Sequence, residues 1–400
     1  MRRIVPVELS PEKPPSIELP PSKSIYNRHR ILYHLAKKPM PVQSSGLPAD
    51  CRNLDLALSS LDEHVYLGQG GTSLRFYLAS RLLEQKPVCV HIDEQLKSRP
   101  IEPLLDALEH LGLKMERGWP LKIEAAQKIG SDVSVNASAS SQFVSALALV
   151  GAFMENSLVI KWTGHLPSRS FLHLTLDILE EWDISYTYYK DGLHIGTGYK
   201  VPKHIFIPGD WASASYAIMG AALRKQPVFI ENLIENTGQP DERIKNFIAP
   251  LGVVLKAGER GMWVECSELP MDLTQMDFSN CPDLAPTFCI WHLIKGIPIW
   301  FTGLKTLNSK ESQRLNKMAE LLKDMQLEVR QSSDSLICEA MNPCFPERYV
   351  ADTSGDHRLA MAFSELCLCI PHFSLSEVES VEKSFPNFWE QMSCWKIALK

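Results

Sequence analysis

The sequence lacks the features that mark several large classes of protein. It has no apolar run near the roughly 18 residues that a membrane-spanning helix needs. Its ten cysteines are scattered, with no C-x-x-C pair, and its formal net charge is −6 over 400 residues. We therefore expect neither a membrane protein, nor a disulfide framework, nor a nucleic-acid binder, because nucleic-acid binders usually carry a basic surface.

The start of the chain also lacks the apolar core of a secretory signal, although Arg2 and Arg3 supply positive charge. We therefore expect a cytoplasmic protein with reduced thiols. With 45% hydrophobic and 22% charged residues, a chain of this length is typical of a globular protein of two domains.

Several signatures of catalysis or cofactor binding are missing as well. No G-x-S-x-G sequence is present, so a serine hydrolase of that type has no support. The twelve histidines show no H-x-x-x-H spacing with an acid between, and we predict no metal site. The glycine-rich segment 67–75 lacks the Lys-Ser/Thr of a P-loop and the spacing of a dinucleotide fingerprint. We therefore predict no cofactor.

What the chain does contain is a repeated pattern of helix, break and β-hairpin, at intervals of roughly 70 residues. In each copy a helical apolar periodicity passes into two β-rich runs around a polar turn. The predicted helices span residues 101–111, 171–182, 242–251 and 315–325, and the hairpins span 113–125, 184–196, 253–266 and 327–339. The first twenty residues are too few for a domain and are predicted to add a strand to the C-terminal half.

A second element recurs between these units, a short polar segment that opens an apolar helix. The six openings are Ser22-Lys23-Ser24, Gly70-Gly71-Thr72, Ser140-Ser141-Gln142, Gly209-Asp210-Trp211, Cys281-Pro282-Asp283 and Gly355-Asp356-His357. Helix N-termini attract anions, and several openings also carry Lys, Arg, Gln or Asp. The pattern predicts helix starts gathered at a cleft that holds an anion, and six capped core helices with no shared site are the alternative.

Eight motifs stand in order along almost the whole chain. They are Ser22-Lys23-Ser24 with Arg28, Leu67-Gly68-Gln69-Gly70-Gly71-Thr72 with Arg75, Arg99-Pro100, Ser140-Ser141-Gln142-Phe143, Gly209-Asp210-Trp211-Ala212-Ser213-Ala214-Ser215-Tyr216, Lys310-Glu311-Ser312-Gln313-Arg314, Gly355-Asp356-His357-Arg358 and Lys383-Ser384-Phe385-Pro386. In this order the chain resembles the 5-enolpyruvylshikimate-3-phosphate (EPSP) synthases, the 3-phosphoshikimate 1-carboxyvinyltransferases.

The resemblance implies an α/β (α+β) fold of two similar domains. Each domain would have three βαβαββ units around buried parallel helices, with the active site in the interdomain cleft. Residues 21–209 would form the first enolpyruvyl transferase domain, and residues 1–20 with 210–400 the second. We expect a monomer that binds small-molecule substrates.

The resemblance also implies the activity. The carboxyvinyl group of phosphoenolpyruvate would pass to the 5-hydroxyl of shikimate 3-phosphate, with release of phosphate, in the shikimate pathway to chorismate and the aromatic amino acids. Both substrates carry phosphate and carboxylate groups, so the site needs a few placed cations in a chain of negative net charge. Glyphosate is the family's inhibitor at the phosphoenolpyruvate site, and Gly71 keeps the small residue that this inhibitor needs.

The same resemblance implies three catalytic residues, which are Asp283 near the hydroxyl, Glu311 at the methylene carbon and Lys23 at the departing phosphate. The sequence does not decide which acid performs which proton transfer. The residues implied for shikimate 3-phosphate are Lys23, Ser24, Arg28, Ser140, Ser141, Gln142, Ser168, Asp283 and Lys310. Those implied for phosphoenolpyruvate are Lys23, Gly71, Arg99, Gln142, Arg314, Arg358 and Lys383.

The chain departs from the family's motifs at several supporting positions. These are Gln69, Phe76, Phe171, Thr306, Asn308, Gln313 and Gly355. The departures leave open a non-catalytic relative that only binds ligands. A UDP-N-acetylglucosamine carboxyvinyltransferase fits less well because it typically opens with Lys-Asn, and an RNA-end enzyme built from similar repeats would need a basic surface.

Overall fold

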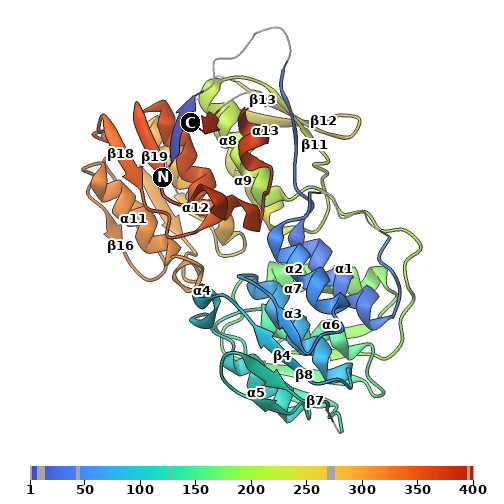
Figure 1. Cartoon of the computed structure of the whole chain (residues 1–400). Coiled ribbons are helices and arrows are strands. Elements are labelled where there is room, and N and C mark those ends of the chain that lie inside the picture. Colours follow the sequence, from blue (N-terminus) through green and yellow to red (C-terminus); the bar gives the residue numbers. More distant parts are fainter. Residues whose placement is uncertain are drawn as a thin grey trace. The chain divides into compact units, whose positions relative to one another are not determined.

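The computed structural model describes residues 2–6, 14–41, 46–126, 128–267, 275–393 and 397–399. The chain divides into two compact units (Figure 1). The first unit comprises Met1–Pro21 and Pro208–Lys400, and the second comprises Ser22–Ile207. The N-terminal segment therefore belongs with the C-terminal half of the chain.

The described part of the second unit contains two four-stranded sheets of the same topology. The first has the order β3-β4-β6-β5, with strands β3 (His64–Tyr66), β4 (Val88–His91), β5 (Met115–Glu116) and β6 (Leu121–Ile123). The other has the order β7-β8-β10-β9, with strands β7 (Asp132–Asn136), β8 (Leu158–Thr163), β9 (Tyr186–Tyr189) and β10 (Gly192–Ile195). In each sheet the first two strands are parallel and the last two form an antiparallel hairpin.

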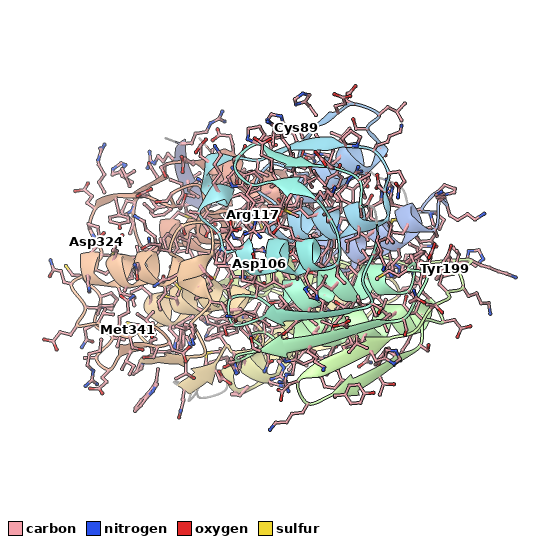
Figure 2. The ribbon with its side chains drawn as sticks, turned by 90° about the horizontal axis from the view of Figure 1, so that it is seen from below. Cys89, Asp106, Arg117, Tyr199, Asp324 and Met341 are labelled. Carbon is pink, nitrogen blue, oxygen red and sulfur yellow. The ribbon has the colours of Figure 1, made fainter. Side chains whose placement is uncertain are left out.

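Three helices of the second unit, α1, α3 and α6, pack against one another. Helix α6 is buried along almost its whole length, as its uniformly apolar sequence predicts. Arg117 in the first hairpin reaches back to α5, donating to Asp106 at 2.5 Å and to Glu109 at 2.6 Å (Figure 2). The helices of this unit are α1 (Lys23–Leu35), α2 (Ala49–Ser59), α3 (Gly71–Ser80), α4 (Glu94–Lys97), α5 (Glu102–His110), α6 (Gln142–Gly151) and α7 (Ser170–Glu181), with the 3-10 helix η1 (Arg81–Leu83).

The described part of the first unit contains three four-stranded sheets, and the N-terminal segment completes two of them. The order β12-β13-β11-β2 joins β2 (Ser16–Glu18), β11 (Val228–Glu231), β12 (Val253–Ala257) and β13 (Gly261–Cys266). The order β14-β15-β17-β16 joins β14 (Gln275–Asp277), β15 (Ile299–Thr302), β16 (Arg330–Gln331) and β17 (Leu336–Cys338). The order β18-β19-β1-β20 joins β18 (Arg348–Ala351), β19 (His372–Leu375), β1 (Arg2–Pro6) and β20 (Ile397–Leu399). The strand predicted within the first twenty residues is thus confirmed twice.

Helix α10 of the first unit packs against both α8 and α12, so three of the predicted helix openings lead into packed helices here too. The helices are α8 (Trp211–Arg224), α9 (Ile244–Ile248), α10 (Ala285–Lys295), α11 (Arg314–Asp324), α12 (His357–Phe363) and α13 (Phe388–Ser393). The 3-10 helices are η2 (Pro240–Arg243), η3 (Ala249–Leu251), η4 (Pro282–Leu284), η5 (Leu307–Ser309), η6 (Ser364–Leu368) and η7 (Val378–Lys383).

The predicted helix 242–251 is divided in the structure, whereas the other three repeat helices and all four hairpins are confirmed. Its residues form the end of η2, the short helix α9 and then η3. Pro250 lacks the N–H that a continuing α-helix would use, which favours the tighter last turn. Gly252 then ends the segment at φ +76°, a left-handed conformation that glycine adopts without strain.

Each unit has its own hydrophobic core. None of the helices in the described part of the chain combines the length and the apolar character needed to cross a bilayer. The cysteines there are free thiols, and five of them are buried, namely Cys51, Cys281, Cys289, Cys338 and Cys367.

Candidate active site

The start of α1 places Lys23 beside a carboxylate that the sequence analysis did not single out. Lys23 Nζ lies 3.0 Å from Asp50 Oδ2, and the Asp50 side chain is almost fully buried. The other oxygen of Asp50 faces the glycine loop, because a Cβ built on Gly70 would lie 3.0 Å from Oδ1. The lysine at the first helix opening is therefore held against the second opening.

Arg75 connects the starts of α3 and α6. Its Nη1 donates to Gln142 Oε1 at 2.8 Å and to the carbonyl of Gly71 at 3.1 Å, while Gln142 Nε2 donates to Thr72 Oγ1 at 2.9 Å. A Cβ at Gly71 would lie 2.7 Å from Nη1 of both Arg75 and Arg99. The missing side chain thus lets two guanidinium groups approach one helix start.

Three predicted serines lie together at the start of α6. Ser140 Oγ accepts from the backbone N–H of Gln142 at 3.2 Å, and Ser141 Oγ donates to the carbonyl of Ser168 at 3.3 Å. Ser168 has a positive φ of 48° in the loop before α7. This corner offers hydroxyl groups suited to a phosphate or a polyol.

Arg28 is buried and forms hydrogen bonds inside the unit. It donates to Thr175 Oγ1 at 2.8 Å and to the carbonyls of Ser24 at 2.7 Å and Phe171 at 2.8 Å. Burial lowers the pKa of Arg28 to about 9. The contact at Phe171 uses its backbone, so the departure from tyrosine there does not remove it. A ligand would have to replace these hydrogen bonds, and the role of Arg28 in ligand binding stays a prediction.

In the first unit, Arg314 is the centre of a buried group of charges. Its Nε lies 2.9 Å from Asp356 Oδ2, its Nη1 2.9 Å from Asp283 Oδ1, and its Nη2 2.8 Å from Glu311 Oε2. Burial alone would lower the pKa of Arg314, but these three carboxylates raise it above its ordinary value. We call the whole group the Arg314 cluster, which consists of Asp283, Lys310, Glu311, Arg314, Asp356, Arg358 and Lys383.

Asp283 contacts two further cations of the cluster. Arg358 Nη2 lies 3.0 Å from Asp283 Oδ2, and Lys310 Nζ lies 3.5 Å from Oδ1. Burial alone would raise the pKa of Asp283, but Arg358, Lys310 and Arg314 together hold it well below its ordinary value. Asp283 is therefore an ionised carboxylate at neutral pH.

Glu311 lies between two cations. Lys383 Nζ, brought from η7, is 2.6 Å from Glu311 Oε1, while Arg314 contacts Oε2. Lys383 and Glu311 are both largely buried. A carboxylate and an ammonium in such close contact form a strong, charge-assisted hydrogen bond.

Asp356 joins the cluster to the start of α12. Its Oδ1 accepts from the backbone N–H groups of Arg358 at 2.9 Å and Leu359 at 3.3 Å, and Ser312 Oγ donates to its Oδ2 at 2.9 Å. The preceding Gly355 has φ +70°. Glycine adopts that conformation freely, so the departure at this position suits the local backbone.

Two other departures, Asn308 in η5 and Gln313 before α11, form hydrogen bonds with the first turn of α11. Asn308 and Asn316 exchange two hydrogen bonds, from Asn308 Nδ2 to Asn316 Oδ1 at 3.0 Å and from Asn316 N to Asn308 Oδ1 at 3.2 Å. Gln313 precedes the helix at φ +51° and accepts from Asn316 Nδ2 at 2.9 Å. These residues support the helix that carries Arg314.

Sequence reasoning missed Asp241 in η2. Its side chain is buried, and its Oδ1 has no hydrogen-bond partner among the described residues. Burial raises the pKa of Asp241 to about 7, and the negative charges of Asp283 and Asp210 add to the effect. An aspartate after a proline ordinarily indicates a helix start, so no sequence signal distinguished it.

The predicted site residues thus fall into two groups, each connected within its own unit. The second unit holds Lys23, Ser24, Arg28, Gly71, Arg99, Ser140, Ser141, Gln142 and Ser168. The first unit holds Asp283, Lys310, Glu311, Arg314, Arg358 and Lys383. Within each group, side chains from distant parts of the sequence meet at helix starts.

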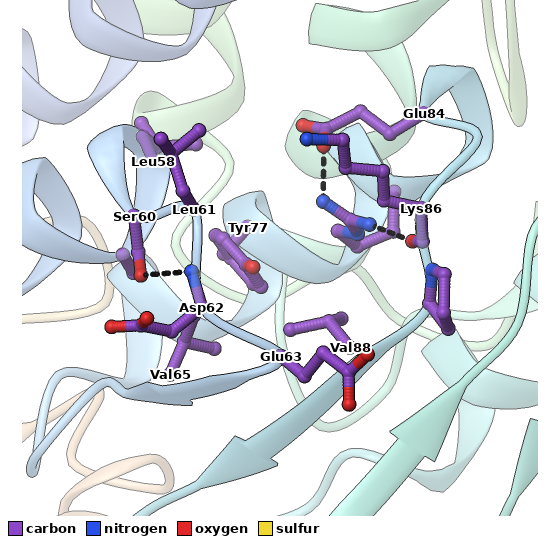
Figure 3. Close-up of a pocket in the computed structure, with 13 residues that line it drawn as sticks. Leu58, Ser60, Leu61, Asp62, Glu63, Val65, Tyr77, Glu84, Lys86 and Val88 are labelled. Carbon is purple, nitrogen blue, oxygen red and sulfur yellow. Dashed lines mark hydrogen bonds and ion pairs between the residues drawn. The ribbon is translucent and has the colours of Figure 1, made fainter.

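A cavity of about 300 Å³ in the second unit contains none of these residues. Leu58, Tyr77 and Val88 line it, and Arg81 forms an ion pair with Glu84 beside it (Figure 3). It is separate from the predicted site residues, and its lining combines apolar side chains with charged ones such as Asp62, Glu63 and Lys86.

Comparisons with known proteins place the chain in a family. The family model described as EPSP synthase (3-phosphoshikimate 1-carboxyvinyltransferase) matches residues 57–392. The 3-phosphoshikimate 1-carboxyvinyltransferase of Bacteroides fragilis (strain YCH46) is 30% identical over 392 residues, covering 94% of each chain. The enzyme of the same name from Yersinia ruckeri is 26% identical over 411 residues, covering 94% of this chain and 95% of its own.

Solved structures agree on the fold. An EPSP synthase from Acinetobacter baumannii matches with a TM-score of 0.73 at 19% identity, covering 100% of this chain and 99% of its own. The enolpyruvyl transferase NikO from Streptomyces tendae matches with a TM-score of 0.72 at 11% identity, covering 100% and 98%. The predicted α/β enolpyruvyl transferase fold is confirmed.

Proposed function

The chain belongs to the EPSP synthase (3-phosphoshikimate 1-carboxyvinyltransferase) family, and we propose that Lys23, Asp283 and Glu311 perform its chemistry. The enzyme transfers the carboxyvinyl group of phosphoenolpyruvate to the 5-hydroxyl of shikimate 3-phosphate and releases phosphate, a step of the shikimate pathway. The Arg314 cluster is the observation that carries the residue assignment, because it holds two of the three residues in one buried network of charges.

Binding of the phosphorylated ring uses the hydroxyl corner at α6 together with a few cations. In this proposal the ring is held by Lys23, Ser24, Arg28, Ser140, Ser141, Gln142, Ser168, Asp283 and Lys310. The serines support it because three of them already lie together with their oxygens at one helix start.

Binding of phosphoenolpyruvate uses the guanidinium and ammonium groups. The proposed contacts are Lys23, Gly71, Arg99, Gln142, Arg314, Arg358 and Lys383. Arg358 and Lys383 now contact carboxylates at 3.0 and 2.6 Å, so substrate anions take over part of their pairing. Such charge-assisted contacts are among the strongest that proteins offer to a carboxylate or phosphate.

In the first chemical step, the 5-hydroxyl oxygen bonds to C2 of phosphoenolpyruvate while C3 gains a proton. Ionised Asp283 stabilises by its negative charge the positive charge that develops at C2, and it then accepts the proton of the 5-hydroxyl as the hydroxyl oxygen bonds to C2. Glu311 delivers the proton to C3, and the Lys383 ammonium, 2.6 Å away, supplies that proton to Glu311.

In the second step, the tetrahedral adduct loses a proton from C3 and the bond from C2 to the phosphate oxygen breaks. Glu311 takes the C3 proton back. Lys23 stabilises the departing phosphate, and its orientation is fixed by Asp50 at 3.0 Å. The double bond is restored, now attached to the ring oxygen. Glu311 returns its proton to Lys383, and the hydroxyl proton held by Asp283 passes to the released phosphate.

Hydrogen exchange at C3 tests the assignment of Glu311. In deuterated water the parent enzyme should introduce solvent deuterium into the methylene carbon during turnover, as read by mass spectrometry. We expect Glu311→Gln to lose this exchange, whereas Glu320→Gln, an exposed acid of α11 paired with Lys317 at 3.1 Å, should retain it. Exchange that survives in Glu311→Gln would assign the C3 proton to another group.

The proposed setting of the reaction is a cytoplasmic monomer in which each compact unit is one enolpyruvyl transferase domain. The exposed large apolar side chains of the described residues, such as Leu61, Tyr189 and Trp300, come from separate parts of the sequence. Apolar residues exposed singly are normal for a monomer surface. Light scattering at several concentrations tests this, and a mass of twice 45.1 kDa would contradict it.

A further inference from the structure

We propose that the second unit carries a binding site for a divalent transition metal such as Zn²⁺, formed by His64, Cys89 and His91. These residues lie on the sheet β3-β4-β6-β5 and belong to none of the groups assigned to the reaction. The sequence predicted no metal site, because the ligands are separated by 25 residues and meet only through strand pairing.

Strand register places the three side chains on one face. Strands β3 and β4 are parallel, with His64 opposite Cys89 and Tyr66 opposite His91. Cys89 and His91 are two residues apart on β4 and so point to the same side. The alternate residues Val88 and Val90 are buried on the other side, in the core. Figure 2 shows where Cys89 lies on the ribbon of this strand.

The ligand atoms are close enough for one ion. One ring nitrogen from each histidine and the Cys89 sulfur all lie within 4.8 Å of one another. His64 Nδ1 and His91 Nε2 are 2.9 Å apart. In a tetrahedral zinc site, nitrogen and sulfur ligands lie about 3.3–3.7 Å from one another, so small side-chain rotations complete the geometry. Two imidazoles and a thiolate are the ligands that zinc prefers, and water can take the fourth position.

The surroundings suit a cation. A neighbouring cavity of about 350 Å³ is lined by His64 and Cys89 and by the acids Glu63, Glu116 and Glu124. The one cation in that lining, Lys122, pairs with Glu116 at 2.9 Å and so has its charge compensated.

The metal would also stabilise the loop that carries Gly70 and Gly71. Hydrogen bonds from Leu67 N to the His91 carbonyl at 3.0 Å and from Asp93 N to the Gly68 carbonyl at 3.1 Å continue the strand pair into that loop. An ion joining His64 and His91 would hold β3 and β4 together just before it. Amide exchange at Leu67 and Asp93 should therefore slow when the metal binds.

The test is a calorimetric titration of the full chain with Zn²⁺, paired with the absorption spectrum of its Co²⁺ complex. We expect one equivalent of Zn²⁺ and a thiolate-to-cobalt charge-transfer band. Cys89→Ser should abolish the band, and His64→Asn and His91→Asn should each weaken Zn²⁺ binding at least about tenfold. Cys344→Ser, which removes an exposed thiol elsewhere in the chain, should change neither.

Thermal unfolding without metal shows whether each variant folds, and substitutions on this solvent-facing side should leave it near the parent value. Zn²⁺ should then raise the unfolding temperature of the parent but not of a Cys89→Ser, His64→Asn double variant. The proposal is overturned if the parent binds no Zn²⁺, if the double variant binds it as tightly as the parent, or if the Co²⁺ complex lacks the thiolate band. In those cases the two histidines share only a hydrogen bond.

Discussion

Arg314 and Asp356 form an ion pair in which both side chains are buried. Nε of Arg314 lies 2.9 Å from Oδ2 of Asp356, and the exposed fractions of the two side chains are 1% and 0%. The same carboxylate caps α12 through its other oxygen. One aspartate thus fixes the arginine that contacts Asp283 and Glu311, which makes it a positioning residue for both proposed catalytic acids.

Asp356→Ala should destabilise the protein by roughly 3–5 kcal/mol, because it leaves Arg314 with less charge compensation and removes the cap of α12. Urea unfolding measures the loss. Asp352→Ala removes an exposed partner of Lys317 and should cost less than about 1 kcal/mol. Equal losses in the two variants would contradict the importance assigned to the buried pair.

Gly71→Ala should weaken phosphoenolpyruvate binding. The added Cβ would lie 2.7 Å from Nη1 of Arg75 and of Arg99, so at least one guanidinium must move. We expect KM for phosphoenolpyruvate to rise about tenfold, equivalent to about 1.4 kcal/mol, with a smaller change in KM for shikimate 3-phosphate. Gly130→Ala is the matched control, because its Cβ would meet neighbours only at 3.7 Å or more. An unchanged KM in Gly71→Ala would remove Arg99 from the proposed binding set.

Lys23→Met should lower kcat by about 10²- to 10³-fold, because the phosphate would leave without its nearby positive charge. Circular dichroism should show a folded protein, since the methionine keeps most of the side-chain volume. Lys317→Met is a suitable control, because its side chain is 22% exposed, against 21% for Lys23. Turnover near the parent value in Lys23→Met would reject the catalytic role.

Asp241→Asn should stabilise the protein relative to the parent, and more so as pH rises. Burial, together with the charges of Asp283 and Asp210, raises the pKa of folded Asp241 to about 7, whereas an unfolded aspartate titrates near 4. Between these values the folded state binds more protons than the unfolded state, so the parent loses stability as pH rises from about 4 through about 7. Asparagine does not ionise, so the Asp241→Asn variant does not lose this stability as pH rises.

Urea unfolding at pH 5 and pH 8 measures this difference. The advantage of Asp241→Asn should grow by a few kcal/mol between the two conditions. Asp191→Asn, in the exposed turn between β9 and β10, should show no such growth. A constant difference between Asp241→Asn and the parent would contradict the raised pKa.

The helices and hairpins were predicted well from the sequence because each one depends on residues that are close together in the chain. The apolar periodicity of residues 171–182 and the turn at Asp191-Gly192 suffice for helix α7 and its hairpin. The helix openings were likewise visible as small polar residues before apolar runs. The predicted helix 242–251 was wrong in its continuity because the missing N–H of Pro250 was not taken into account.

Local sequence could not predict which residues contact one another within the site. Arg314 contacts Asp283, 31 residues before it, and Asp356, 42 residues after it. The pKa of Asp241 is raised by burial and by charges that helix packing brings near it, and no sequence spacing reveals either. His64 meets Cys89 only because β3 and β4 pair in one particular register. Resemblance to a family supplied residue roles, but not these contacts.

The central claim is that this chain joins its two substrates with Asp283 as a reacting group. The most direct measurement is phosphate release by the purified parent and by Asp283→Ala, with shikimate 3-phosphate and phosphoenolpyruvate together and each alone. The account predicts release by the parent only when both substrates are present, and a loss of at least about 10²-fold in Asp283→Ala. Release from phosphoenolpyruvate alone, or parent-like release by the variant, would contradict it.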